Sequence, residues 1–436
     1  MEWYWAFLLL MGSFFILIML GIPVVFSFFA VNVVLLYAYM GEAGLELMID
    51  SIYGSLAVFV LLPITLFILM GEILFRSGIA MRAIDTLDKW LGRLPGRLAL
   101  LAVAAGTLLA TLSGASISST AMLGSTLTPS MEARGYKPMM SIGPLLGSGG
   151  LAVLMPASAL GVILAVIASV SVGKLLIAII VPGLLLAVTF CIYIVGACTL
   201  KPSLAPSYDV VHTPLREKLV LTAKYVLPLG IIMFLVIGAV FLGIATPTEA
   251  SALGTAGAFG LAACYRQLNR LVIRKALYST LRISVMVLVI LAGAQAFTQL
   301  LAYTGSTRSL VAWASALTIP GIWVIVMMHA VTFVLGGPIG GIPLIMMTIP
   351  VFIPVVKALG FDPIWFCVVM LMNVELAQIT PPFGITLYVM RGIAPSTPMS
   401  AITMAAVPII LCHIVVMALI IAVPPLAMLL PSLMLK

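Results

Sequence analysis

Long apolar runs separated by short polar segments dominate the chain. About ten of these runs have 17 or more residues with almost no charge, which is long enough to cross the hydrocarbon core of a bilayer as a helix. Lipid cannot hydrogen-bond free backbone groups, so apolar runs of this length are typical of membrane-spanning helices. The predicted crossings are 4–20, 24–40, 56–75, 139–169, 175–197, 225–242, 247–264, 283–302, 364–390 and 401–424, of which 139–169 and 364–390 are broken.

Composition narrows the class of protein further. The 436 residues are 63% hydrophobic and 8% charged, and their mean hydropathy is +1.29. A soluble globular chain carries about 25% charged residues, so this chain cannot cover a soluble surface with polar groups. We therefore predict an all-α polytopic membrane protein and exclude a cytosolic enzyme or a disordered chain. The five cysteines and three histidines show no metal-binding or disulfide spacing, so no cofactor is expected.

The positions of Lys and Arg predict the orientation of the chain. Two further apolar stretches, 97–130 and 321–354, are interrupted mid-way by small residues, Gly or Pro. If both are re-entrant hairpins, 17 of the 21 basic residues fall in cytoplasmic loops, whereas a full crossing at either place would remove this bias. The charge pattern therefore favours hairpins and places both termini on the periplasmic side. It also accounts for the net charge of +8, so no nucleic-acid partner is expected.

The two halves of the chain resemble each other at a nearly constant spacing. Pro95-Gly96 matches Pro320-Gly321 at a spacing of 225 residues, and three further proline pairs match at the same spacing. Each half then contains five crossings, and an odd number gives the halves opposite orientations. Inverted repeats with discontinuous helices are typical of secondary transporters, which bind substrate and ion where the repeats meet near the bilayer midplane.

This repeat predicts the domain organisation. The first inverted repeat spans 1–197, a cytoplasmic linker spans 198–224, and the second repeat spans 225–436. The segment 80–94 is amphipathic, so we expect an interfacial arm that connects a fixed part to a moving part. The first repeat is predicted to contain scaffold helices 1–75, the arm 80–94, the re-entrant hairpin 97–130 and the broken helix 139–169. The second repeat is predicted to contain the arm 306–318, the re-entrant hairpin 321–354 and the broken helix 364–390.

Four apolar stretches are interrupted at matching places. Non-helical backbone at membrane depth must be buried in protein or line an aqueous cavity. Its carbonyl oxygens and nearby hydroxyls suit Na⁺, and the N-terminus of a half-helix suits a carboxylate; the alternative is that Ser and Thr only pack or cap helices. The candidate ion- and substrate-binding residues are Ser113, Gly114, Ser116, Ser118, Ser119, Thr120, Gly149, Gly150, Pro156, Gly336, Gly337, Gly340, Asn373, Glu375, Thr380, Pro381 and Pro382.

Glu375 is the only acidic residue inside one of these breaks. An ionisable side chain at membrane depth is expected to be functional. It can ligate a cation, carry a proton or hydrogen-bond the unwound backbone, and the sequence leaves these three roles open. Glu249 follows Thr246-Pro247-Thr248 and is predicted instead to begin a helix, near its positive dipole end.

Five segments carry motifs of a known family. They are 114–124 (GASISSTAMLG), 131–138 (MEARGYKP), 245–250 (ATPTEA), 373–384 (NVELAQITPPFG) and 387–392 (LYVMRG). With these motifs the chain resembles, over essentially its whole length, the large membrane subunit of TRAP (tripartite ATP-independent periplasmic) transporters.

The resemblance implies a secondary active transporter of the bacterial inner membrane with an elevator mechanism, in which the hairpins and broken helices slide against a fixed scaffold. It implies Na⁺ coupling, an organic-acid substrate delivered by a periplasmic binding protein, and a small membrane subunit of about four helices. The tip 336–343 departs from the family because it has no side-chain oxygen, so an ion there must use backbone carbonyls. By this resemblance Na⁺ is expected near Ser116, Ser118, Gly340 and Thr380.

Two other functions were compared with this one. A stand-alone proton- or cation-coupled carrier of organic anions would use Glu375 and need no binding protein. An intramembrane hydrolase is excluded, because the chain has no His-Glu-x-x-His, no Gly-x-Ser-x-Gly and no paired intramembrane Asp. The sequence does not identify the organic acid.

Overall fold

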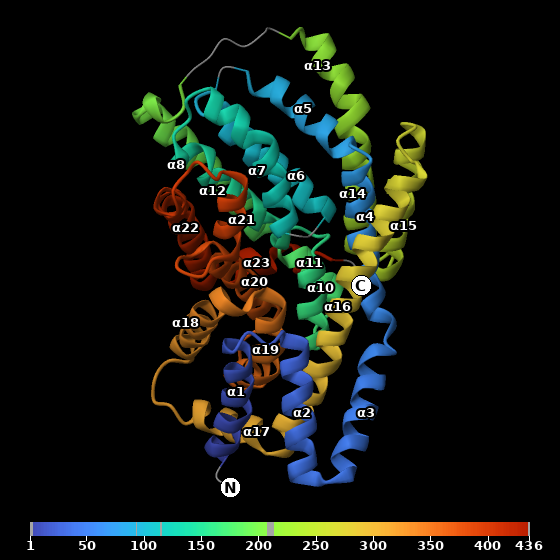
Figure 1. The fold of residues 1–436 in the computed structure, drawn as a ribbon, viewed down its shortest axis with the longest axis vertical. Helices are drawn as coiled ribbons and strands as arrows, with labels where there is room; N and C mark the ends of the chain where they lie inside the picture. Colours follow the sequence, from blue (N-terminus) through green and yellow to red (C-terminus); the bar gives the residue numbers. More distant parts are fainter. Residues whose placement is uncertain (1–2, 93, 114–115, 207–212, 435–436) are drawn as a thin grey trace.

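The computed structural model of the chain describes residues 3–92, 94–113, 116–206 and 213–434. Within these ranges every regular element is a helix and no strand occurs. Figure 1 shows the helices stacked into an elongated bundle, with the N-terminus at one end of its long axis. The prediction of an all-α protein is confirmed.

The first half begins with helices that match the predicted crossings closely. Its elements are α1 (Trp3–Met19), α2 (Val24–Met40), α3 (Glu42–Leu56), η1 (Phe59–Leu61), α4 (Leu62–Arg76), α5 (Ile79–Leu91), α6 (Arg97–Ser113), α7 (Ser116–Ala133), α8 (Pro138–Ser141), α9 (Gly143–Gly150), η2 (Leu151–Leu154), α10 (Ala159–Ile167), α11 (Val172–Ala178), α12 (Ile180–Leu200) and η3 (Pro202–Leu204).

The second half has the same order of elements as the first: a long helix, a short amphipathic helix, a helix pair and a broken helix. The inverted relation between the halves stays a prediction. The elements of the second half are α13 (Leu215–Leu221), η4 (Thr222–Val226), α14 (Leu227–Phe241), α15 (Pro247–Cys264), α16 (Arg270–Tyr303), α17 (Ser306–Ser315), α18 (Gly321–Ile339), α19 (Gly341–Ala358), α20 (Pro363–Ile379), α21 (Ile385–Ile393), α22 (Met399–Ala422) and α23 (Pro425–Ser432).

Several helices have the length and apolar character of membrane spans. Among the described residues, six are long and apolar enough to cross a membrane on their own. A seventh span is formed if Pro138–Leu154 and Ala159–Ile167, which are bent by 47°, are counted together. Helices α1, α2, α6, α18 and α20 are apolar but shorter. These lengths are those of a multi-pass membrane protein.

Two helix pairs occupy the places of the predicted hairpins. Helix α6 packs against α7, and α18 packs against α19. Gly340 makes the second turn with a φ of +82°, a backbone conformation that side chains other than glycine rarely adopt. The two broken helices are interrupted at 155–158 and at 380–384, where the sequence placed Pro156 and Pro381-Pro382.

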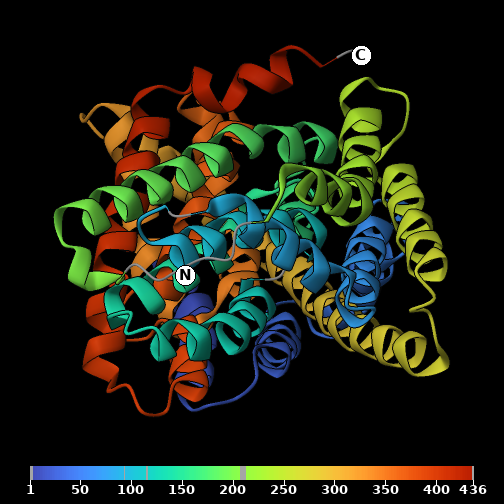
Figure 2. The ribbon, with the colours of Figure 1, turned by 90° about the horizontal axis from the view of Figure 1, so that it is seen from above.

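The helices form two groups, which are seen side by side in Figures 1 and 2. The group that we call the scaffold contains α2, α3, α4, α14, α15 and α16, which pack on one another. The group that we call the hairpin group contains α6–α10 and α18–α22. The two groups meet where α4 contacts α6 and α10, and where α16 contacts α19.

A buried polar contact fastens two scaffold helices together. Asn32 in α2 donates from Nδ2 to the carbonyl oxygen of Gly293 in α16 at 2.7 Å. A Cβ at Gly293 would lie 2.8 Å from the Cβ of Phe28, so glycine is needed for α2 to approach α16 this closely. The contact joins residues 261 positions apart in the sequence.

Three segments that the sequence assigned to loops are helical. Helix α3 occupies the stretch 41–55 between the predicted crossings 24–40 and 56–75, the helix before the crossing 225–242 begins at Leu215, and α16 begins at Arg270 instead of 283. The predicted limits were wrong there because apolar character marks the part of a helix in lipid. A helix satisfies its own backbone hydrogen bonds, so it continues into the polar region at no cost in unpaired groups.

The predicted helix start at Glu249 is confirmed. The hydroxyl of Thr246 accepts a hydrogen bond from the backbone N–H of Glu249 at 3.3 Å. In return, Glu249 Oε2 accepts one from the backbone N–H of Thr246 at 2.8 Å. This reciprocal capping box satisfies two backbone donors at the start of α15.

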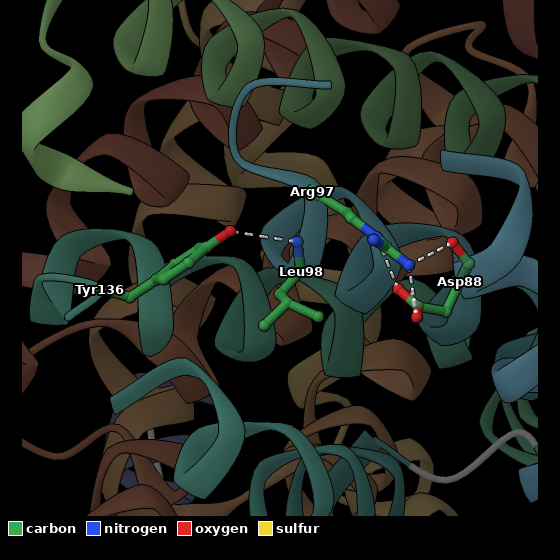
Figure 3. Close-up of polar contacts among 4 residues, drawn as sticks. All are labelled: Asp88, Arg97, Leu98 and Tyr136. Atoms are coloured by element: carbon green, nitrogen blue, oxygen red, sulfur yellow. Dashed lines mark hydrogen bonds and ion pairs between the residues drawn. The ribbon is translucent and has the colours of Figure 1, made fainter. Parts of the chain in front are cut away.

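The arm α5 is bound to the start of the first hairpin through an ion pair (Figure 3). Arg97 binds both carboxylate oxygens of Asp88, from Nε to Oδ1 at 2.9 Å and from Nη2 to Oδ2 at 2.6 Å. On the other side, the backbone N–H of Leu98 donates to the hydroxyl of Tyr136 at 3.4 Å. The base of the hairpin is therefore held between the arm and the segment that follows α7.

Replacing Asp88 with asparagine is expected to lower the free energy of unfolding by about 2 kcal/mol, because it leaves the buried Arg97 guanidinium without its countercharge. The matched control is Glu217→Gln, which breaks the exposed pair between Lys89 and Glu217 and should cost less than about 1 kcal/mol. Thermal unfolding of the detergent-solubilised protein measures both. Equal melting temperatures for the two variants would contradict this role of the ion pair.

Candidate functional site

A cavity of about 1120 Å³ lies between the scaffold and the hairpin group. Helices α2, α4 and α16 form one wall, and both hairpins and both broken helices form the other. The candidates Ser116, Ser118, Gly340 and Glu375 all line it, and most of the remaining wall is apolar. The polar and charged side chains on its wall are those of Glu72, Arg76, Ser116, Ser118, Ser125, Glu375 and Gln378.

Glu375 is the centre of the polar contacts in this cavity, although its side chain is only 1% exposed. Its Oε1 accepts hydrogen bonds from Ser116 Oγ at 2.5 Å and from Gln378 Nε2 at 3.2 Å. Ser116 is the first residue of α7, so the contact ties the first hairpin to the second broken helix. The other oxygen, Oε2, has no hydrogen-bond partner among the described residues.

The first broken helix brings two glycines against these side chains. A Cβ at Gly150 would lie 3.1 Å from Glu375 Oε2, and a Cβ at Gly149 would lie 1.7 Å from Thr120 Oγ1. The carbonyl oxygen of Ser116 lies 3.2 Å from the same Cβ position of Gly149. Glycine thus lets α9 approach α7 and α20 closely. As a result, oxygen atoms of α7 and α20 gather against the backbone of α9.

This gathering of oxygen atoms suits a small hard cation. A buried carboxylate needs a compensating charge, and none of the ion pairs within the described part of the chain includes Glu375. Thr120 Oγ1 is also buried and, like Glu375 Oε2, has no partner there. Buried polar atoms without partners are costly, and carboxylate, hydroxyl and carbonyl oxygens are the ligands of hard cations.

The cluster does not have the ligands of a resident transition-metal site. Among the described residues, no group of three or more His, Cys, Asp or Glu side chains could hold a metal ion. An ion beside Glu375 would therefore depend on hydroxyl and backbone oxygens for its remaining ligands. Such a ligand set is characteristic of transported cations at broken membrane helices.

The glycines at the tip of the second hairpin allow close packing. A Cβ on Gly336, Gly337 or Gly341 would lie 2.7–2.9 Å from a side chain of α20 or of the break that follows it. The tip therefore rests directly on the second broken helix. It brings no side-chain oxygen to the cavity, as the sequence of this tip indicates.

Two candidates on the second broken helix make hydrogen bonds within the hairpin group and do not line the cavity. Asn373 donates from Nδ2 to the carbonyl oxygen of His329 at 2.8 Å and to Thr332 Oγ1 at 2.5 Å, which fastens α18 to α20. Thr380 donates from Oγ1 to the carbonyl oxygen of Leu376 at 2.6 Å. Both side chains therefore stabilise the hairpin group in this structure.

The proline candidates lie at the helix breaks. Pro156 is buried between η2 and α10, and Pro381-Pro382 follow the end of α20. Proline lacks a backbone N–H and cannot continue the hydrogen-bonding pattern of a helix, which accounts for both interruptions. None of the three lines the cavity.

The remaining candidates of the first hairpin lie on different faces of α7. Ser118 is exposed on the cavity wall, whereas Ser119 is fully buried. Gly114 and the side chain of Ser113 lie outside the described residues. The predicted hydroxyl cluster therefore includes one residue bound to Glu375, one facing the cavity and two buried within the hairpin group.

Four polar cavity residues were missed by the sequence candidates: Glu72, Arg76, Ser125 and Gln378. Gln378 lies one helical turn after Glu375, so the spacing of three residues was a signal that these side chains share a face. Glu72 and Arg76 end α4, where charged residues are also expected simply because the helix reaches the membrane edge. Nothing in the sequence indicated that these two face the hairpin tips.

A solved structure shares this fold. The crystal structure of the YdaH transporter from Alcanivorax borkumensis aligns with a TM-score of 0.65 at 16% identity. The alignment covers 88% of this chain and 89% of that chain. The likeness shows that the two chains share a fold.

Sequence comparison identifies the family. The isethionate TRAP transporter permease protein DctMQ of Oleidesulfovibrio alaskensis is 26% identical over 424 residues, which cover 96% of this chain and 65% of that protein. The C4-dicarboxylate TRAP transporter large permease protein DctM of Pseudomonas aeruginosa is 31% identical over 377 residues, 86% of each chain. The sequence model of the tripartite ATP-independent periplasmic transporter, DctM component, matches residues 11–426. The chain therefore belongs to the DctM family, the large permease subunits of TRAP transporters.

Proposed function

We propose that this permease imports a small organic acid by Na⁺-coupled transport, with an elevator movement of the hairpin group against the scaffold. The observation that carries the proposal is the buried Glu375 carboxylate. It is bound to the first hairpin through Ser116 and lies on a cavity between the two helix groups.

The contacts of Glu375 favour cation binding. The amide of Gln378 and the hydroxyl of Ser116 both donate to Oε1, an arrangement that suits an ionised carboxylate. Its second oxygen and Thr120 Oγ1 need a further partner. A monovalent cation supplies both the countercharge and that partner. Because the ligands come from α7 and α20, binding of the ion would lock the first hairpin onto the second broken helix.

The helix termini favour an organic anion as the substrate. Helix α7 begins at Ser116 and α19 begins at Gly341, and both residues line the cavity. The N-terminus of a helix carries a partial positive charge and free N–H groups, which bind carboxylates. Relatives of this chain are named for C4-dicarboxylate and isethionate, which are both organic acids.

Two partners complete the proposed transporter. A periplasmic binding protein delivers the acid, and a small membrane subunit associates with the scaffold in the bacterial inner membrane. The relative named DctMQ is longer than this chain, which covers 65% of it, and this supports a further membrane subunit. In the proposed mechanism the arms α5 and α17, which precede the two hairpins, connect the fixed and moving parts.

Reconstitution in proteoliposomes tests the function. The permease, its small subunit and the binding protein are assayed with a panel of labelled dicarboxylates, keto acids and sugar acids under an inward Na⁺ gradient. Uptake is expected to require both Na⁺ and the binding protein, and to fall to background when K⁺ replaces Na⁺. Uptake driven by a pH gradient without Na⁺ or binding protein would contradict the proposal and favour the stand-alone proton-coupled carrier.

A further inference from the structure

Arg76 is the only basic side chain among the described residues that line the cavity. It is the last residue of α4 and therefore belongs to the scaffold, on the wall opposite the hairpin tips. The acidic residues among the described lining residues are Glu72, beside Arg76, and Glu375 in the hairpin group. Among the described lining residues, Arg76 is thus the one positive charge available to an anion, and it is shared with the Glu72 carboxylate in an ion pair at 2.6 Å.

Two contacts hold the Arg76 guanidinium in place. Its Nε donates to Glu72 Oε2 at 2.6 Å, and its Nη2 donates to Ser279 Oγ in α16 at 2.6 Å. Neither contact uses Nη1. A guanidinium is always charged and has five donors in one plane, so a fixed arginine with free donors is well suited to a carboxylate.

We infer that Arg76 forms a carboxylate-binding site on the scaffold, which holds the transported acid against the fixed wall of the cavity. This inference rests on the proposed function and assigns one substrate contact to the fixed helices. The walls around Arg76 are mostly apolar, for example at Ile68, Phe75 and Ile283. The Arg76 side chain itself is 32% exposed, so a charge-assisted hydrogen bond to the acid would be screened in part by water.

The position of Arg76 makes the contact specific to one conformation. In the proposed mechanism the hairpin group moves and α4 does not, so the acid reaches Arg76 only when the cavity lies beside the end of α4. A group that binds the substrate in one state favours that state by its binding free energy. Arg76 would therefore stabilise the loaded state on the side of the membrane at which α4 ends.

The alternative role for Arg76 is an anchor at the membrane edge, since basic residues gather on the cytoplasmic side. An anchor affects insertion and folding but leaves the affinity for the acid unchanged. The two roles are separated by the dissociation constant of the acid. That constant is measured in detergent at saturating Na⁺ on the permease with its small subunit, without the binding protein, because the binding protein would bind the acid itself. The ligand is the panel acid that the wild-type protein transports best.

Arg76→Gln is expected to weaken binding of the acid about tenfold or more, because it removes a charge-assisted contact. Arg76→Lys keeps the charge but loses the planar fork, and should weaken binding by about threefold. The matched control is Arg82→Gln. Arg82 lies on α5 with its guanidinium 5.5 Å from the ring centre of Tyr225, away from the cavity, so its loss should leave the dissociation constant unchanged.

A wild-type dissociation constant in Arg76→Gln would overturn the inference. If that variant does not fold, Ser279→Ala replaces it: the charge stays but one contact that holds the guanidinium is lost, and binding should weaken about two- to fivefold. Unchanged affinity in Ser279→Ala would then overturn the inference. If the wild type shows Na⁺-driven uptake but one of these variants keeps the wild-type dissociation constant, only the role of Arg76 is contradicted. If no panel acid is taken up at all, the proposed function is contradicted as well.

Discussion

Glu375→Gln is expected to abolish Na⁺-driven uptake and the stabilisation of the protein by Na⁺. Glutamine keeps the size of the side chain and an oxygen that can accept from Ser116, but it removes the negative charge that attracts the ion. Loss of one member of a buried charge pair costs about 3–5 kcal/mol, which is a factor of more than a hundred in ion affinity. Melting temperature as a function of Na⁺ concentration measures the effect directly. The wild-type protein should gain about 2.7 kcal/mol at a Na⁺ concentration of one hundred dissociation constants.

The same experiment separates the alternative roles of Glu375. If Glu375 binds no ion, its carboxylate is an uncompensated buried charge in the wild-type protein. Glu375→Gln would then raise the melting temperature at every Na⁺ concentration. Uptake that persists in the variant but loses its pH dependence would show proton carriage instead of ion ligation. Glu132→Gln, an exposed change near the end of α7, is the control and should respond to Na⁺ as the wild type does.

Gly149→Ala is expected to displace the first hairpin and to eliminate Na⁺ binding. The added Cβ would lie 1.7 Å from Thr120 Oγ1, far inside van der Waals contact, so the Thr120 side chain or α7 as a whole must shift away from α9. Forcing extra volume into a packed core costs about 1–3 kcal/mol. The shift also moves the Thr120 hydroxyl away from its place against the backbone of α9. Uptake should fall to background, with a lower melting temperature that no longer rises with Na⁺.

Gly196→Ala is the matched control for this change. Gly196 is also helical, in α12, but a Cβ there meets nothing within 4 Å. Alanine is the better helix former by about 1 kcal/mol, so this variant should be at least as stable as the wild type. The double change Thr120→Ala with Gly149→Ala removes the clashing hydroxyl and should recover stability but not Na⁺ dependence. Recovery of Na⁺ dependence in the double variant would contradict a role for Thr120 in ion binding.

Much of the fold could be predicted from the chain because a bilayer limits the choices. Lipid leaves helices as the only way to satisfy the backbone of a long apolar run, so the crossings and the helix pairs at 97–130 and 321–354 follow from the pattern. Proline and glycine mark the helix breaks for an equally local reason. The limits of α3 and α16 could not be predicted this way, because a helix can extend beyond the lipid.

Within the site, the sequence by itself determined which residue types lie at the breaks: the hydroxyls of 113–120, the glycines and the single acidic residue Glu375. Only the tertiary structure decided how they are used. It joined Glu375 to Ser116 across 259 positions, set Asn373 to fasten α18, and turned Arg76 toward the cavity. These outcomes depend on which helix faces meet in space. Packing between distant segments sets those faces, and no local pattern along the chain encodes them.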